Sequence, residues 1–137
     1  MSKRTILVVT LLLAAAAGLA AVSGVFAGPQ EVTVSNVKGN PAAYLGKVSI
    51  TGKAGAVHSE KGVIEMVDEK ACCSIYLLVP FTAGQQKELQ SESLFQGDWP
   101  QQGQPLVAIG EVSQTDKGYA LDVSEVQSGG RTLLRRL

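Results

Sequence analysis

The chain has 137 residues, of which 45% are hydrophobic and 18% are charged, with 12 basic residues balancing 12 acidic ones. This length corresponds to a single domain, since domains commonly have about 100–200 residues, and the composition excludes the collagen-like and disordered classes. A strong basic excess is the usual mark of a nucleic-acid or anionic-membrane partner, so the balanced charge indicates neither.

The first 27 residues have the features of a secretory signal peptide. Lys3 and Arg4 precede a largely apolar stretch, residues 6–22, and Val25 and Ala27 occupy the −3 and −1 positions of a cleavage site. A positive start, an apolar middle and a small-residue exit are typical of a signal peptide. The alternative is a retained anchor, because the apolar stretch approaches the roughly 20 residues that span a membrane.

Cleavage after Ala27 leaves residues 28–137, which carry 10 basic and 12 acidic residues and a net charge of −2. We therefore expect a periplasmic or secreted protein with no membrane span after cleavage. Such compartments are oxidising, so the redox state of any cysteine pair becomes a question.

The mature chain is predicted to form short strands. Asn40-Pro41 favours a short helix over residues 41–44. Apolar residues then recur at every second position over 48–56, which is typical of a half-buried strand. Gly52 and Gly55 within it predict a sharp bend or a bulge.

The later elements follow from turn residues and apolar runs. A hairpin leads to a second strand over 62–67, and the third strand, over 72–81, has two largely apolar faces, which predicts burial on both sides or a central position. The remaining expectations are a short exposed helix over 85–92, strands over 106–112 and 119–126, a break at 128–130, and a basic-apolar C-terminal tail over 131–137.

Five strands with a helix between the third and the fourth are the order of an oligonucleotide/oligosaccharide-binding (OB) barrel. A β-sandwich would need about seven strands. The predicted fold class is therefore all-β, a five-stranded OB barrel over residues 28–130, with one short helix before the first strand and another between strands 3 and 4.

A resemblance to a known family rests on the run 34–37 and on the run 40–52, in which a short helix ends in Tyr44-Leu45-Gly46-Lys47 and an alternating strand then reaches Gly52. This pattern resembles the opening of exported bacterial OB-fold proteins, the relatives of tRNA-anticodon-binding-like OB domains, and residues 103–110 and 118–126 fit their second half. The resemblance implies a fold and not a ligand.

The periplasmic haem chaperone of cytochrome c maturation is a distant relative in the same pattern. That family carries haem covalently on a histidine near a tyrosine in its C-terminal tail, and residues 131–137 of this chain contain neither. Covalent haem carriage is therefore not transferred to this chain.

Cys72 and Cys73 are adjacent, and four interpretations stay open. They are small core residues, a vicinal disulfide in a constrained eight-membered ring, a bridge between two chains, or part of a soft-metal site. A metal would need a third ligand, for which His58 is the candidate, and the usual zinc spacing between cysteines is absent.

Three aromatic residues are candidate binding residues. Tyr76 and Tyr119 fall on predicted strands, where an OB barrel stacks ligands, although tyrosines there are equally normal in cross-strand pairs. Trp99 is either a lid over the barrel mouth, a partner contact, or a plug that closes one end of the barrel.

No catalytic motif is found, and a single histidine removes most acid–base schemes, so no enzyme activity is predicted. Asp68 and Glu69 are expected to be solvated turn charges. Two functions remain: a non-catalytic exported binding module for a protein, peptide or small molecule, and a periplasmic thiol- or soft-metal-handling protein that uses Cys72 and Cys73. Nucleic acid is disfavoured by export and by the net charge of −2.

Overall fold

The structure of the chain is a computed structural model, which describes residues 28–70 and 72–137. The predicted signal peptide lies outside these described residues. Within them, the elements in chain order are β1 (Gln30–Thr33), α2 (Val34–Gly39), the 3₁₀ helix η1 (Pro41–Tyr44), β2 (Gly46–His58), β3 (Val63–Val67), β4 (Ser74–Leu78), α3 (Ala83–Glu88), β5 (Phe95–Gly97), β6 (Pro105–Thr115), β7 (Gly118–Ser128) and β8 (Arg131–Arg136).

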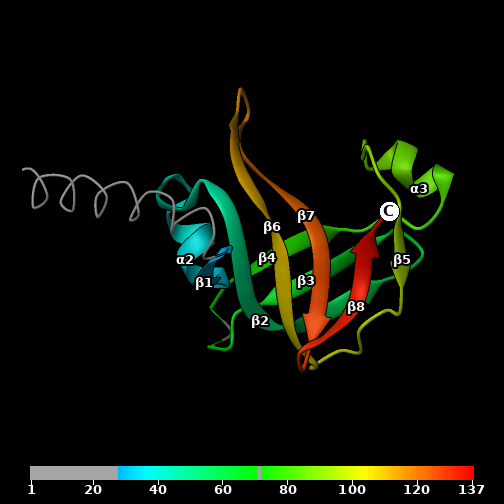
Figure 1. Ribbon diagram of the computed structural model, residues 1–137, viewed down its shortest axis with the longest axis horizontal. Helices are drawn as coiled ribbons and strands as arrows, with labels where there is room; N and C mark the ends of the chain where they lie inside the picture. Colours follow the sequence, from blue (N-terminus) through cyan, green and yellow to red (C-terminus); the bar gives the residue numbers. More distant parts are fainter. Residues whose placement is uncertain (1–27, 71) are drawn as a thin grey trace, which may run out of the picture.

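The strands form one strongly curled sheet. Its order is β4-β3-β2-β6-β7-β8-β5, with every neighbouring pair antiparallel, and β1 pairs in parallel with β2. Figure 1 shows that the sheet curls until β3 and β4 cross behind β6 and β7, which makes a half-barrel. The all-β, barrel-like prediction is confirmed, but the sheet has eight strands over the described residues, and not five.

The bend of β2 has its cause in its glycines. This strand pairs with β6 from Gly46 to Lys53 and with β3 from Lys53 to His58, so it changes partner at its middle. A Cβ atom at Gly52 would lie 2.6 Å from the carbonyl oxygen of Val67. The register to β3 also shifts between Ala54 and Val57, as a bulge does. The predicted bend and bulge are thus confirmed.

The short helices begin where side chains cap them. The Oγ1 atom of Thr33 accepts a hydrogen bond from the Asn36 N–H at the start of α2, and Thr82 does the same for Gln85 at the start of α3. The predicted helix over 41–44 is η1. The helix after the third predicted strand is α3, which ends at Glu88, earlier than expected.

The C-terminal segment differs from the expected tail. Gly129 and Gly130 both have positive φ, +59° and +78°, which suits the two-residue turn of a β-hairpin. They therefore connect β7 to β8, and β8 also pairs with β5 on its other side. Two of the three leucines of this segment, Leu133 and Leu134, are buried in the core, whereas the terminal Leu137 is exposed.

The core lies inside the curl. Each of the eight strands contributes inward-facing residues to it, including Phe95 of β5, and two valines of α2 close one side. Its fully buried large side chains are Ile50, Ile64, Met66, Leu77, Leu106, Leu134, Val34, Val48, Val79 and Val126.

Candidate functional site

The curl of the sheet leaves a seam between β4 and the first half of β7. β4 ends the sheet order and pairs only with β3. β7 pairs with β6 along its whole length, but its pairing with β8 begins only at Glu125. Across the described residues, therefore, β4 and residues 118–123 of β7 are neighbours with no ladder of hydrogen bonds between them. We call this gap the seam.

The backbone of β4 presents hydrogen-bonding groups to the seam. The Asp68 N–H donates to the Cys73 carbonyl, and the Val79 N–H donates to the Gly62 carbonyl. Residues of an antiparallel pair alternate between hydrogen-bonded and non-hydrogen-bonded positions. The N–H and C=O groups of the odd-numbered residues of β4 therefore point toward β3. The N–H and C=O groups of Tyr76 and Leu78 consequently point away from β3, toward the open edge.

The side chains along the seam are unusually exposed for their type. The exposed fractions are 60% for Tyr76, 43% for Leu78 and 44% for Tyr119. The prediction that this third strand is buried on both sides or central is wrong. Its two apolar rows look alike in sequence, but β4 is an edge strand, so only the inner row with Leu77 reaches the core.

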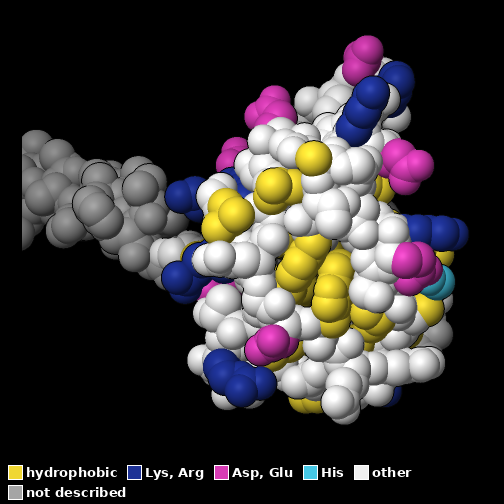
Figure 2. All heavy atoms as spheres, turned by 90° about the vertical axis from the view of Figure 1, so that its right-hand side faces the viewer, with side chains coloured by type: hydrophobic (Ala, Val, Ile, Leu, Met, Phe, Trp, Pro, Cys, Tyr) yellow, Lys and Arg dark blue, Asp and Glu magenta, His cyan; other side chains and the backbone are white. Residues whose placement is uncertain are grey.

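Two hollows follow the seam and share Ala120 and Leu121. The larger, of about 710 Å³, is lined by Leu78, Leu89, Gln90, Ser91, Glu92, Ser93, Phe95, Thr115, Ala120, Leu121, Asp122, Val123 and Arg136. The smaller, of about 190 Å³, is lined by Val37, Lys38, Pro41, Ile75, Tyr76, Val112, Tyr119, Ala120 and Leu121. Figure 2, which faces the α3 side of the molecule, shows hydrophobic side chains gathered in a recess with charged side chains around it.

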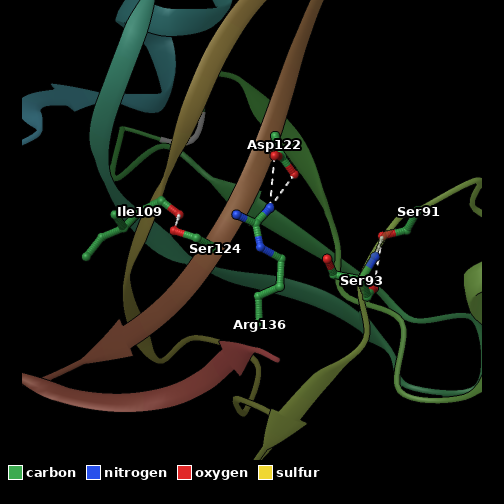
Figure 3. A network of polar contacts seen from close by, with 6 residues as sticks. All are labelled: Ser91, Ser93, Ile109, Asp122, Ser124 and Arg136. Atoms are coloured by element: carbon green, nitrogen blue, oxygen red, sulfur yellow. Dashed lines mark hydrogen bonds and ion pairs between the residues drawn. The ribbon is translucent and has the colours of Figure 1, made fainter.

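The wall of the larger hollow carries an ion pair. Arg136 reaches from β8 to Asp122 on β7, and its Nη1 donates to both carboxylate oxygens at 2.9 Å (Figure 3). Nearby, the Ser91 Oγ donates to the Ser93 carbonyl at 3.0 Å, which holds the loop after α3. The hollow thus combines an apolar floor with both signs of charge on its wall.

The predicted binding residues do not all meet. Tyr76 and Tyr119 line the smaller hollow together. Trp99 does not join them: it stacks on Phe81, with ring centroids 4.7 Å apart, and packs half-buried against the core. Trp99 is therefore a packed residue outside the two hollows.

Cys72 and Cys73 lie in the turn between β3 and β4, and the structure pairs their sulfur atoms in a vicinal disulfide. Cys72 is exposed, and Cys73 is half-buried against the core. His58 is not near them: it lies opposite Val63, at the far end of β3, roughly 16 Å away for five extended residues. Nowhere in residues 28–70 and 72–137 does the structure gather three His, Cys, Asp or Glu side chains that could hold a metal ion.

Asp68 ties this turn to α2, and the expectation of a solvated charge is wrong. Its carboxylate is buried, accepting the Ser35 N–H at 3.2 Å and the Lys70 N–H at 3.1 Å. The hydrogen bond from Lys70, followed by that from Ser35, holds the pKa of Asp68 below its usual value of 3.8, against the opposing effect of desolvation. Lys38 of α2 adds a second tie, since its Nζ donates to the Ser74 carbonyl at 2.9 Å.

Sequence reasoning missed Leu78, Asp122 and Arg136 as site residues. Leu78 has no local signal, because its exposure depends on which strand ends the sheet. Asp122 and Arg136 are 14 residues apart and meet only because residues 131–136 return as a strand. A signal did exist for that strand, the Gly129-Gly130 hairpin turn.

No family model matches the chain, and neither a curated protein nor a solved structure matches it significantly. Among the described residues, no helix has both the length and the apolar character needed to cross a membrane.

Proposed function

We propose that this chain is an exported, non-catalytic binding module of the OB-fold type that captures an extended polypeptide segment along the open edge of β4. The observation that carries this proposal is the seam. There the N–H and C=O groups of Tyr76 and Leu78 face outward, beside exposed apolar side chains.

The element order supports the OB-fold part of the proposal. When β1, β5 and β8 are set aside, the chain runs through three strands, α3, and two strands, the order that the resemblance implies. OB folds are partly open barrels, and the opening here lies between the third and the fifth of these strands. The signal-peptide features of residues 1–27 support export.

An extended polypeptide is the ligand chemistry that this edge fits best. Strand addition uses main-chain hydrogen bonds for affinity, and alternating side-chain pockets for specificity. Tyr76 and Leu78 supply the main-chain groups, whereas the Ser74 carbonyl is already occupied by Lys38. The two hollows, on either side of Leu121, offer places for side chains of the incoming segment.

Nucleic acid fits the same surface less well. The larger hollow carries Asp122 and Glu92 together with Arg136, and phosphate backbones are bound by a clear excess of basic side chains. A polypeptide backbone carries no net charge and avoids that cost.

The test uses random peptides displayed on phage and selected against residues 28–137. Selected peptides, labelled with fluorescein, are then titrated with the wild-type chain and with Tyr76→Pro by fluorescence anisotropy. Proline removes the outward N–H of Tyr76 without removing a bond to β3, and it is tolerated on edge strands. We expect binding to weaken by about tenfold or more, since a backbone hydrogen bond and the close approach of the ligand are both lost.

Two matched controls separate the edge from general effects. Tyr76→Thr keeps the N–H and a good strand residue, so it should retain most of the binding. Leu78→Lys places a charge on the edge and should abolish binding, whereas Leu45→Lys, at a 52% exposed leucine outside the seam, should leave it unchanged.

Three results would overturn the proposal. The first is equal binding by the Tyr76→Pro variant, and the second is selection of no peptide at all. The third is a wild-type dimer in light scattering that Tyr76→Pro converts to a monomer, because the edge would then belong to a second copy of the chain.

A further inference from the structure

We propose that the Cys72–Cys73 pair is a thiol–disulfide exchange site that accepts electrons from external thiols through Cys72, its exposed residue. The pair lies in the β3–β4 turn, directly before the first residue of β4. This inference does not depend on peptide capture at the seam.

The disulfide is poorly suited to a structural role. Disulfides stabilise folds mainly by closing long loops of the unfolded chain. Here the two cysteines are adjacent, with a sequence separation of 1, so the closed loop is the smallest that a chain can form and restricts the unfolded state very little. Stability of the fold therefore gives no reason for the pair.

The turn is held by other contacts. The Asp68 carboxylate accepts hydrogen bonds from the N–H groups of Ser35 and Lys70, and the Asp68 N–H donates to the Cys73 carbonyl at 2.9 Å. Lys38 holds the Ser74 carbonyl. None of these contacts uses a sulfur atom, so the turn keeps its anchors when the disulfide opens, as a reversible site requires.

The adjacency of the cysteines also favours reduction. Two neighbouring residues close an eight-membered ring, and constrained or exposed disulfides are the ones that exchange readily with thiols. Cys72 is exposed whereas Cys73 packs against the core, so Cys72 is the member of the pair that an incoming thiol approaches. The Lys38 ammonium donates to the carbonyl of Ser74, the residue after Cys73, and so adds a positive charge to the same turn.

The reaction balances with two thiols. A thiolate attacks the Sγ of Cys72, a mixed disulfide forms, the bond between the two sulfurs of the pair breaks, and Cys73 leaves as a thiolate that takes a proton from water. A second thiol attacks the mixed disulfide, releases Cys72 as a thiol, and leaves as the oxidised external disulfide. Two electrons pass from the external thiols to the pair.

The test measures thiols by intact mass after alkylation of the folded chain. As purified in air, residues 28–137 should take up no alkyl group, and after equilibration with reduced glutathione, without denaturant, they should take up two. Circular dichroism should show the same fold in both states. In a second arm, a peptide with a single cysteine replaces glutathione. Exchange with glutathione alone identifies small thiols as the electron donors. Exchange with both reagents shows that cysteines of polypeptides are donors as well.

The single variants assign the attacked sulfur. In oxidised glutathione, Cys73→Ser should form a mixed disulfide at Cys72 at least tenfold faster than Cys72→Ser forms one at Cys73, because only Cys72 is exposed. The double variant, Cys72→Ser with Cys73→Ser, should unfold at nearly the wild-type denaturant midpoint.

Several outcomes would overturn the inference. They are two free thiols that persist in oxidised glutathione, a disulfide that glutathione reduces only in denaturant, and loss of the fold on reduction, which would make the pair a structural crosslink.

Discussion

The carboxylate of Asp68 joins two parts of the molecule at the scale of a single residue. It lies at the end of β3 and accepts two hydrogen bonds, one from the Ser35 N–H in the first turn of α2 and one from the Lys70 N–H in its own turn. The sequence around it, Asp68-Glu69-Lys70, looks like an ordinary polar turn. Only the position of α2, which is set by the pairing of β1 with β2, turns this aspartate into a buried acceptor.

Asp68→Asn should lower the denaturation midpoint at pH 7, because asparagine has one acceptor oxygen for two N–H groups. The pKa of Asp68 in the folded chain lies below its unfolded value, since Lys70 and Ser35 donate to the charged form. The stabilisation is therefore complete above the unfolded pKa of about 4 and is lost as pH falls through the folded pKa.

The measurement is urea denaturation of wild type and Asp68→Asn between pH 7 and pH 2. We expect the difference between them to shrink as the pH falls below about 4. Glu69→Gln, at the exposed neighbour, is the control and should shift the midpoint little at any pH. A difference between wild type and Asp68→Asn that is constant with pH would contradict this account.

At the scale of elements, β8 shows how a terminal segment becomes part of the core. Its sequence, Arg131 to Arg136, alternates poorly because two leucines stand side by side between arginines. In the structure both leucines are buried: β8 lies between β7 and β5, and its pairing to β7 shifts register between Val126 and Gln127. The bulge lets adjacent residues both reach apolar surroundings.

Leu134→Ala should destabilise the fold by about 3 kcal/mol, the usual cost of truncating a fully buried leucine. Chemical denaturation, followed by circular dichroism, measures this loss. Arg131→Ala, at an exposed position of the same strand, is the matched control and should change the free energy of unfolding by less than about 0.5 kcal/mol. Equal, small effects of both substitutions would mean that the segment is a tail after all.

The open seam is a property of the whole molecule. β2, β6 and β7 are central strands of the sheet, whereas β4 is one of its edges. Proteins usually cover or charge an exposed edge, since it is a template for pairing with another chain. This edge carries Tyr76 and Leu78 instead, which is consistent with a surface that receives a partner.

Amide hydrogen exchange should report this architecture residue by residue. The amides of Tyr76 and Leu78 should exchange roughly 100-fold faster than those of Ile75 and Leu77, because only the odd-numbered residues of β4 donate to β3.

The control strand is β6, which pairs on both sides, to β2 and to β7. Two adjacent amides within it, Val107 and Ala108, should both be protected. NMR exchange measurements on the folded chain provide the rates. Uniform protection along β4 would show that another segment pairs with its edge, and would remove the basis of the seam.

The sequence alone determined the class of the fold and much of its local structure. Period-two alternation over residues 48–56, the glycines at 52 and 55, the Pro41 helix start and the turn residues are local signals, and each acts through the conformations open to a few neighbouring residues. The vicinal cysteine pair and the candidate tyrosines were also visible, because they are single features of composition and spacing.

The tertiary structure alone decided which strand stays at the edge, which apolar row faces solvent, and which distant residues meet. The two rows of β4 are nearly alike in sequence, and their difference arises because the sheet curls without closing its ladder to β7. Asp68 with Ser35, Arg136 with Asp122, and Tyr76 with Tyr119 lie far apart in the chain. Which strands pair depends on the apolar surface that the whole sheet buries in each arrangement, so local propensities do not determine the pairing.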